Sequence, residues 1–306
     1  MSWETELDKW AAEYLPDLQI KTDEPMSRHI SFRVGGPARR MAFPSSGEQV
    51  VLLLNFAHAC GARPLVIGNG TNLLAPDEGL DRLVVDTSAG LNRLEEGEEP
   101  DILTAEAGVS LARLADFACK LGLTGLEFAH GIPGTVGGAV CMNAGAYGGE
   151  IKQVIETVTI LFPEEGVRTL SCAEMDFGYR HSLLTDQPNA VVLRASFRLS
   201  KGDPEMIREG MRELLSRRKA TQPLEYPSAG STFKRPAGNF AGALIESSGL
   251  KGLTVGGAQV SEKHAGFIIN TGSATAADVL EVIRQVQERV FTETGVRLEP
   301  EVRIIH

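Results

Sequence analysis

Short apolar runs and amphipathic stretches alternate along the chain, and their spacing predicts most of its helices and strands. Apolar residues at helical spacing predict helices over residues 3–15, 49–60, 111–121, 241–247 and 274–294. Short apolar runs predict buried strands over residues 64–67, 82–86, 102–107, 154–162, 190–199, 255–260, 267–269 and 301–305. Ser110 before the third helix and Gly122 after it are typical start and stop residues.

The pattern breaks after residue 200. A polar helix is predicted over residues 205–219, and it is followed by the segment 221–227, which contains two prolines. Proline restrains its own backbone and that of the residue before it, so this segment is expected to be a stiff, extended connector. We therefore expect a domain boundary close to residue 204.

Two loops are unusually rich in glycine. Residues 68–73 follow a predicted strand, and residues 131–139 continue into Asn143–Ala146. A backbone with few Cβ atoms can bring its N–H groups against an anion. Neither loop matches the usual dinucleotide fingerprint or a P-loop, and each alone is most simply a tight turn. As a pair, they indicate a ligand with a central pyrophosphate, such as a dinucleotide cofactor.

Composition narrows the range of partners. The chain has 306 residues, a net charge of −10 and 42% hydrophobic residues, which is ordinary for a globular protein with real cores. The negative charge argues against nucleic acid or an anionic membrane as the main partner. We expect no signal peptide, no membrane span, no metal site and four reduced cysteines without C-x-x-C spacing, and hence a cytoplasmic protein.

A few polar residues stand where a fold alone does not require them. Arg180 follows an aromatic residue and a glycine, and Ser231 lies on a glycine turn before two cations. Glu301 and Arg303 are two positions apart, hence on one face of a strand. Each has an ordinary alternative: a surface ion pair, a helix cap or a solvated strand residue. Together they supply a proton donor, a carboxylate and cations, which a reduction beside an anionic substrate needs.

These motifs, in this order, resemble the UDP-N-acetylenolpyruvoylglucosamine reductases, flavoenzymes of bacterial peptidoglycan precursor synthesis. The resemblance covers nearly the whole chain and rests on residues 31–38, 67–74, 125–139, 179–180, 230–234, 241–246 and 299–305. Any one of these motifs would be weak evidence. Seven in the right order are strong evidence.

The resemblance implies an α+β fold. It implies an FAD-binding region of the vanillyl-alcohol-oxidase (PCMH) type with two subdomains, residues 1–80 and 81–203, and a C-terminal α+β substrate-binding domain, residues 204–300. The last strand, residues 301–306, is expected to return to the second subdomain.

The resemblance also implies the chemistry. NADPH, as co-substrate, reduces non-covalently bound FAD, and the flavin N5 gives a hydride to C3 of UDP-N-acetylglucosamine enolpyruvate. A serine, matching Ser231, protonates C2 to yield UDP-N-acetylmuramate for the cell wall. Arg180 and Glu301 match the pair that polarises the enolpyruvyl carboxylate and stabilises the enolate-like intermediate.

Further residues are assigned by the same resemblance. Those expected to bind FAD are Gly68, Asn69, Gly70, Thr71, Asn72, Leu73, Thr135, Gly138, Ala144, Gly145, Tyr179 and Arg303. Those expected to bind the substrate phosphates are Arg217, Lys219, Lys234 and Arg235. Because a serine hydroxyl is a weak acid, a cation is expected to assist Ser231, and Lys219, Lys234 and Arg235 are the candidates.

Two features depart from longer members of that family. The four tyrosines are Tyr14, Tyr147, Tyr179 and Tyr226, and none lies in the substrate-binding domain beyond the connector of residues 221–227. The chain therefore resembles a shorter subtype without a tyrosine lid loop. His130 is interpreted as a polar neighbour of the glycine loop rather than as a covalent flavin link.

Two other functions remain as alternatives. One is an FAD-dependent oxidase of the same fold acting on an alcohol or sugar. The other is a nucleotide-binding module without chemistry, which the presence of Arg180, Ser231 and Glu301 disfavours. The expected partner is a small molecule, with no nucleic acid and no membrane, and the interpretation is compatible with a monomer.

Overall fold

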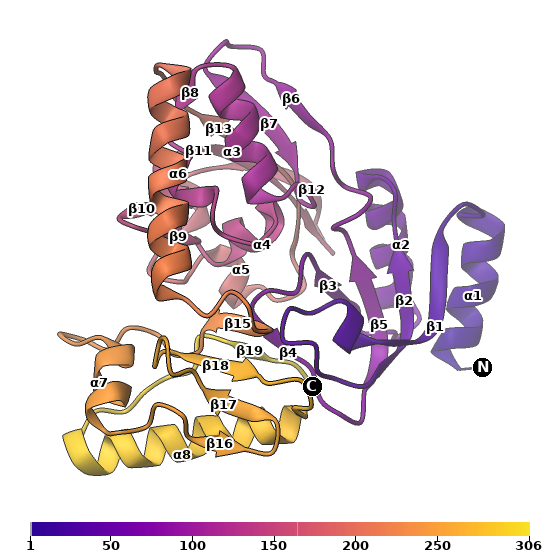
Figure 1. The fold of residues 1–306 in the computed structure, drawn as a ribbon. Coiled ribbons are helices and arrows are strands. Elements are labelled where there is room, and N and C mark those ends of the chain that lie inside the picture. Colours follow the sequence, from indigo (N-terminus) through magenta and orange to yellow (C-terminus); the bar gives the residue numbers. More distant parts are fainter. Residues whose placement is uncertain (1, 164) are drawn as a thin grey trace. The chain divides into compact units, whose positions relative to one another are not determined.

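The computed structural model describes residues 2–163 and 165–306, and the chain divides into two compact units (Figure 1). The N-terminal unit comprises the chain up to Thr22, Arg39–Asn69 and Arg82–Ser216. The C-terminal unit comprises Asp23–Ala38, Gly70–Asp81 and Arg217–His306. Two early segments thus belong with the end of the chain, and the three-part division at residues 80, 203 and 300 stays a prediction.

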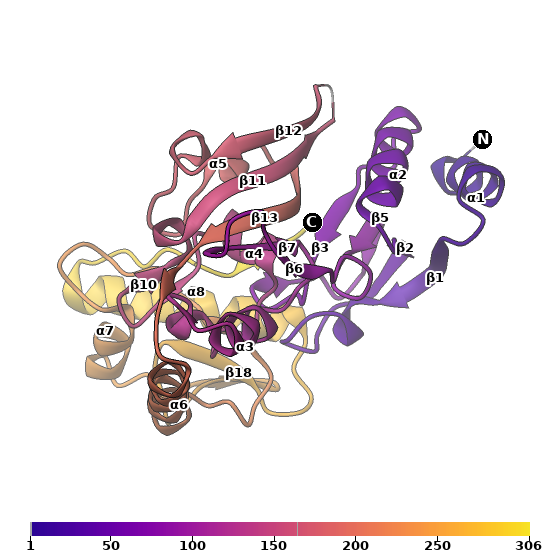
Figure 2. The ribbon, with the colours of Figure 1, turned by 90° about the horizontal axis from the view of Figure 1, so that it is seen from above.

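The first sheet has four strands in the order β1-β2-β5-β3, with β3 parallel to β5. Helices α1 and α2 lie side by side on one face of it (Figure 2), and the ring of Trp10 stacks on that of Phe56 with centroids 4.4 Å apart. The elements are α1 (Trp3–Tyr14), β1 (Gln19–Pro25), β2 (Pro37–Phe43), α2 (Gly47–Ala59), β3 (Leu65–Ile67) and β5 (Leu80–Asp86).

The second sheet of the N-terminal unit has five antiparallel strands in the order β12-β11-β13-β7-β6. Its strands are β6 (Leu94–Glu96), β7 (Ile102–Glu106), β11 (Ile155–Phe162), β12 (Gly166–Ser171) and β13 (Val191–Arg198). The helices around it are α3 (Leu111–Lys120), α4 (Val136–Cys141), α5 (Leu183–Asp186) and α6 (Pro204–Thr221). The core between them is apolar and includes the fully buried Phe197 and Leu103.

Short elements connect these larger ones. They are β8 (Leu123–Thr124) paired with β14 (Ser200–Lys201), β9 (Gly145–Ala146) paired with β10 (Gly149–Glu150), and the 3₁₀ turns η2 (Glu127–Ala129), η3 (Ile151–Gln153) and η4 (Ala173–Met175).

The C-terminal unit is built on a four-stranded antiparallel sheet in the order β15-β18-β17-β16, with the long helix α8 packed along it (Figure 1). Strand β4 pairs in parallel with β19 elsewhere in this unit. The elements are η1 (Met26–Arg28), β4 (Leu73–Leu74), β15 (Ser228–Ser231), α7 (Ala241–Ser247), β16 (Thr254–Val255), β17 (Ala258–Val260), β18 (Phe267–Asn270), α8 (Ala276–Thr294) and β19 (Arg303–Ile304).

Local sequence signals account for both ends of helix α8. Thr275 and Asp278 form a capping box, in which each side chain bonds the other residue's main-chain N–H. Asp77 adds a second cap, because its carboxylate accepts the N–H groups of Ala276 and Ala277 at 2.8 and 3.0 Å. After α8, Gly295 has φ +72°, a left-handed conformation typical of a helix end.

Most predicted helices are present, with their ends shifted by a few residues at most. Helix α7 has the predicted bounds, and Ser110 caps α3 by accepting the N–H of Arg113. The single strand predicted over residues 255–260 is wrong: β16 and β17 form a hairpin, and Gly256 has φ +51° in its turn. Among the helices of the described residues, none is both long and apolar enough to cross a bilayer.

His264 is a partly buried titratable group in the C-terminal unit. Its ring packs edge-on against Phe267 at 4.9 Å between centroids, and its Nδ1 accepts the N–H of Gly266 at 3.1 Å. Burial lowers the pKa of His264, and Lys251 lowers it further while Glu246 opposes this. The folded structure thus favours the neutral ring, whose Nδ1 is free to accept.

We predict that replacing Thr275 by Ala destabilises the protein. Loss of the capping hydroxyl leaves an N–H at the start of α8 without its partner, which costs about 1 kcal/mol. Urea unfolding followed by circular dichroism measures this cost. Ser273→Ala, at an exposed position two residues earlier, is the matched control and should leave the midpoint in place.

We also predict that His264 makes stability depend on pH. Its folded pKa lies below its unfolded value of about 6.5, so its contribution is complete above that pH and declines as pH falls through the folded pKa. His264→Gln keeps an acceptor but does not titrate. Between about pH 8 and about pH 5, the urea midpoint should fall more in the wild type than in this variant. If the urea midpoint falls equally in the wild type and in His264→Gln, His264 is not a cause of the pH dependence.

Candidate functional site

The two glycine loops of the N-terminal unit contact each other. Gly68 follows β3, and a Cβ at this position would lie 2.2 Å from the Oγ1 of Thr135, so no larger residue fits. The Asn69 amide donates to the carbonyl of Pro133 at 2.8 Å. The structure therefore brings together Gly68 and Asn69 from the first loop and Thr135 from the second.

These loops fit the pyrophosphate of a dinucleotide. Residues 68–73 and 131–139 contain no Asp or Glu that would repel an anion. A Cβ at Gly138 would meet only the Thr135 Oγ1, at 3.7 Å, so the main chain there is open to a ligand. Of the predicted cofactor residues in these loops, Gly138 is exposed, whereas Thr135 is buried and the Asn69 amide donates to Pro133.

Asn143 connects the second glycine loop to the segment that carries Arg180. It is fully buried with φ +40°, and its amide donates to Glu150 Oε2 at 2.8 Å and to the Gly178 carbonyl at 2.9 Å. Its Oδ1 accepts the N–H of Lys152 at 3.0 Å. Sequence analysis did not assign this role. The available signal was an Asn in a glycine-rich loop, where left-handed backbone is common.

Tyr179 and Arg180 lie at the tip of a tight turn. Gly178 and His181 exchange main-chain hydrogen bonds at 3.1 and 3.3 Å across it. Arg180 has φ +54°, and its Nη2 donates to the carbonyl of Gly145 at 3.3 Å. Its guanidinium lies 5.1 Å from the ring centre of the exposed Tyr179. The predicted residues Gly145, Tyr179 and Arg180 are thus neighbours, and Ala144 adjoins them in the chain.

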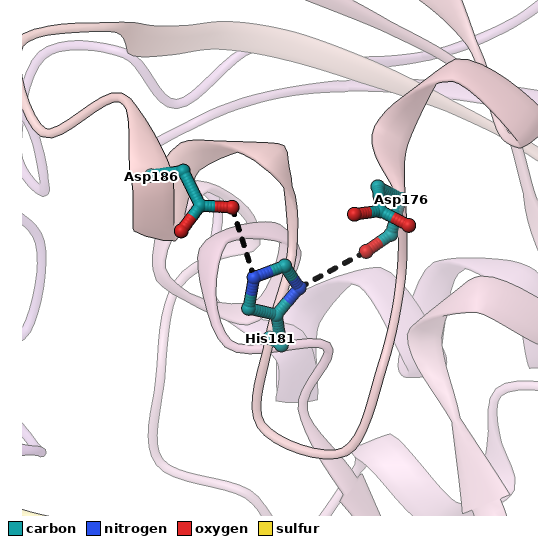
Figure 3. Close-up of side chains that lie close together, drawn as sticks. All are labelled: Asp176, His181 and Asp186. Atoms are coloured by element: carbon teal, nitrogen blue, oxygen red, sulfur yellow. Dashed lines mark hydrogen bonds and ion pairs between the residues drawn. The ribbon is translucent and has the colours of Figure 1, made fainter.

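The side chains of His181 and Ser182, at the end of the turn, form hydrogen bonds that stabilise it. The ring of His181 lies between the main-chain oxygen of Asp176, 3.1 Å from Nδ1, and a carboxylate oxygen of Asp186, 3.2 Å from Nε2 (Figure 3). The buried Ser182 donates to the carbonyl of Cys141 at 2.8 Å. Sequence analysis assigned no role to His181 or Ser182. The acceptors of His181 are five residues away on either side, a spacing of neither helix nor strand, and the acceptor of Ser182 is 41 residues away.

In the C-terminal unit, Ser231 is exposed at the end of β15, beside a bulge. Ser228 pairs with Ile269 and Ser231 with Phe267, so β15 has one extra residue. Gly230, within the bulge, has φ +75°, and a Cβ there would meet nothing within 4 Å. Bulges redirect side chains near active sites. Here glycine is needed for its backbone conformation rather than for space.

Main-chain contacts bring Glu301 next to the strand of Ser231. The N–H of Glu301 donates to the carbonyl of Thr232 at 2.8 Å. The Asn72 amide donates to the carbonyl of Glu301 at 3.1 Å, and the Asn72 carbonyl accepts the N–H of Arg303 at 2.9 Å. Predicted proton donor, carboxylate and part of the predicted cofactor segment therefore meet in this unit.

The remaining residues of that segment lie alongside. Leu73 pairs with Arg303 in the parallel β4–β19 ladder, and Thr71 lies between Asn72 and Gly70. The Gly70 carbonyl accepts the N–H of Ser31 at 3.1 Å, and a Cβ at Gly70 would lie 2.2 Å from the carbonyl oxygen of His29. Gly70 is thus required by close packing of two segments.

The predicted phosphate-binding cations are dispersed within the C-terminal unit. Arg217 and Lys219 are exposed on the last turn of α6. Lys234 Nζ lies 3.5 Å from the carboxylate of Glu299, and the Arg235 guanidinium lies 4.5 Å from the ring centre of Phe240. Which of them assists Ser231 stays open.

The glycine-containing motif at residues 31–37 has a structural role. Ser31 Oγ donates to the Ser228 carbonyl at 2.6 Å, and the carbonyl of the buried Phe32 accepts the Asn270 amide at 3.0 Å. A Cβ at Gly36 would lie 2.2 Å from the carbonyl oxygen of Asp77. These contacts fix the motif against the start of β15 and the end of β18.

Two family models match the chain. The FAD binding domain model matches residues 38–171, and the model described as UDP-N-acetylenolpyruvoylglucosamine reductase, C-terminal domain, matches residues 222–305. A solved alkyldihydroxyacetonephosphate synthase covers 64% of this chain and 40% of its own, with a TM-score of 0.50 and 17% identity, a likeness of fold alone. The predicted α+β fold with a PCMH-type FAD-binding region is confirmed, and FAD is the cofactor.

Close relatives match over nearly the full length. The UDP-N-acetylenolpyruvoylglucosamine reductase of Agathobacter rectalis is 49% identical, over 97% of both chains. The crystal structure of UDP-N-acetylenolpyruvylglucosamine reductase from Thermus caldophilus has a TM-score of 0.79 and 36% identity, over 94% of this chain and 99% of its own. With such identity along its whole length, the chain belongs to the UDP-N-acetylenolpyruvoylglucosamine reductase family.

Proposed function

We propose that this chain catalyses the NADPH-dependent reduction of UDP-N-acetylglucosamine enolpyruvate to UDP-N-acetylmuramate, a step in peptidoglycan precursor synthesis. The observation that carries the proposal is the full-length likeness to reductases of that name, at 49% identity. The Ser231–Glu301 arrangement supports it, because the Glu301 N–H is bonded to the residue after Ser231. This bond joins the segments that carry the hydroxyl and the carboxylate assigned to the protonation of carbon.

The N-terminal unit contributes the cofactor residues in this proposal. Bound FAD supplies the hydride transfer from NADPH to C3 of the enolpyruvyl group. Gly68, Asn69, Thr135 and Gly138 hold the pyrophosphate through main-chain and amide donors, as the open main chain at Gly138 allows. The remaining cofactor residues, Gly70–Leu73, Ala144, Gly145, Tyr179 and Arg303, complete the assignment.

Ser231 is assigned as the proton donor to C2. A serine hydroxyl gives up its proton reluctantly, so a cation has to stabilise the alkoxide that remains. Lys219, Lys234 and Arg235 are the candidates, and with Arg217 they are also assigned to the substrate diphosphate, which cations bind well. The bulge at Gly230 supports the assignment, because it sets the direction of the Ser231 side chain.

Arg180 and Glu301 are assigned to stabilise the negative charge that develops on the substrate during reduction. Hydride addition at C3 leaves negative charge delocalised over C2 and the neighbouring carboxylate. A preorganised guanidinium stabilises that charge in the transition state more than in the bound substrate, which is what accelerates the step. Arg180 is held for this purpose in a left-handed conformation, a strain typical of functional positions.

The proposed function predicts a two-step absorbance change. Under anaerobic conditions, NADPH should bleach the flavin band at 450 nm or thereabouts, about one equivalent per FAD, and UDP-N-acetylglucosamine enolpyruvate should then restore it. Bleaching without recovery would point to another acceptor, such as that of an oxidase of the same fold. A protein that binds no FAD would contradict the assignment of both glycine loops.

Ser231→Ala should separate the two half-reactions. We expect unchanged bleaching by NADPH but reoxidation by the enolpyruvyl substrate slower by about 10²- to 10⁴-fold, the usual contribution of a general acid. Stopped-flow absorbance measures both rates. Ser228→Ala on the same strand is the matched control, since only its main-chain oxygen is used, by Ser31. Normal reoxidation in Ser231→Ala would rule out Ser231 as the proton donor.

A further inference from the structure

The imidazole of His181 faces a hydrogen-bond acceptor on each side. Nδ1 lies 3.1 Å from the main-chain oxygen of Asp176, and Nε2 lies 3.2 Å from a carboxylate oxygen of Asp186 (Figure 3). A carbonyl and a carboxylate can only accept. Whichever ring nitrogen carries the hydrogen, it has an acceptor within hydrogen-bond distance, and the ring lies between the two sides of the segment.

The bridged segment contains the turn of Arg180. Asp176 precedes the turn, His181 closes it through main-chain bonds with Gly178, and Asp186 ends the short helix α5 after it. Both Asp176 and Arg180 have left-handed backbone, at φ +47° and +54°. A non-glycine residue in that region is strained and persists only where its surroundings hold it there. The His181 ring is the side chain that connects both flanks.

We propose that His181, together with Asp186, is a positioning residue that holds the 178–181 turn in the conformation presenting Arg180. The inference rests on the proposed function, in which Arg180 stabilises the charge formed during substrate reduction. His181 itself does not contact the reacting atoms in this proposal. It acts by keeping the Arg180 guanidinium in one place, so its loss misplaces that charge while the FAD loops remain intact.

A metal ion is the competing explanation for the same residues. One ligand atom from each of Asp176, His181 and Asp186 can be chosen within 4.8 Å of one another, and no ion is present. A metal would require a ring nitrogen with a free lone pair and the Asp176 carboxylate as a ligand. The contact seen instead uses the main-chain oxygen of Asp176. A change of the Asp176 side chain therefore distinguishes a metal site from the hydrogen-bonded arrangement.

The experiment compares both half-reactions in four variants. Arg180→Ala is the reference, His181→Ala and Asp186→Ala remove either end of the Nε2 bond, and Asp176→Asn is the matched control. Asn tolerates left-handed backbone, so Asp176→Asn keeps the main-chain acceptor and changes only the carboxylate. Stopped-flow measures flavin reduction by NADPH and reoxidation by the enolpyruvyl substrate, each with and without EDTA.

We expect His181→Ala and Asp186→Ala to slow reoxidation by about 10-fold or more, since a misplacement near 1 Å costs up to about 10²-fold. Flavin reduction by NADPH should stay within about two-fold, which also shows that the variants are folded and bind FAD. The double variant should be no slower than His181→Ala alone, because both changes remove one bond. Asp176→Asn and EDTA should have no effect.

Several outcomes would overturn the proposal, and they are distinguishable. If Arg180→Ala reoxidises normally, the proposed role of Arg180 fails and the positioning role fails with it. If Arg180→Ala is slow but His181→Ala and Asp186→Ala are normal, only the positioning role fails. Equal slowing of both half-reactions would indicate a general structural role. Slowing by Asp176→Asn or EDTA would indicate a metal site instead.

Discussion

The parallel pairing of Leu73–Leu74 with Arg303–Ile304 is the contact on which the chemistry of the C-terminal unit depends. It holds Asn72 against Glu301 by a hydrogen bond between residues 229 positions apart in the sequence. Next to this pairing, the Thr232 carbonyl accepts the N–H of Glu301. Because these links are main-chain or amide hydrogen bonds, they fix the backbones of the segments that carry Ser231 and Glu301 relative to each other.

The N-terminal unit uses close packing and buried polar groups for the same purpose. Gly68 lies so close to Thr135 that a methyl group could not be added, which locks the two loops together. The buried Asn143 then ties the second loop to the Arg180 turn, with both ends of its amide satisfied. A fully bonded buried amide admits few alternative arrangements. The glycine loops and the Arg180 turn, which are separate motifs in the sequence, are therefore held together by these contacts.

The features that could be predicted from the sequence are those that depend on residues close together in the chain. Helices α3, α7 and α8 follow from apolar spacing and from local caps such as Ser110 and Thr275. The β16–β17 hairpin was missed because an apolar run continues through the glycines of its turn. The placement of residues 23–38 and 70–81 with the C-terminal unit depends on pairing across most of the chain, which no local pattern encodes. His181 was missed for a different reason: both of its acceptors are only five residues away, but a spacing of five matches neither the helix nor the strand period.

The fold alone does not decide the reaction. The alkyldihydroxyacetonephosphate synthase with a similar fold is only 17% identical, and a shared scaffold hosts different chemistries. The reductase assignment therefore depends on groups outside the shared cofactor scaffold. Ser231 and Glu301 lie within the matched C-terminal reductase domain, whereas Arg180 lies outside both matched ranges, 38–171 and 222–305. The support for Arg180 is local instead: it has a left-handed backbone at φ +54°, which a non-glycine residue adopts only where its surroundings hold it, and its turn is flanked by the bonded ring of His181.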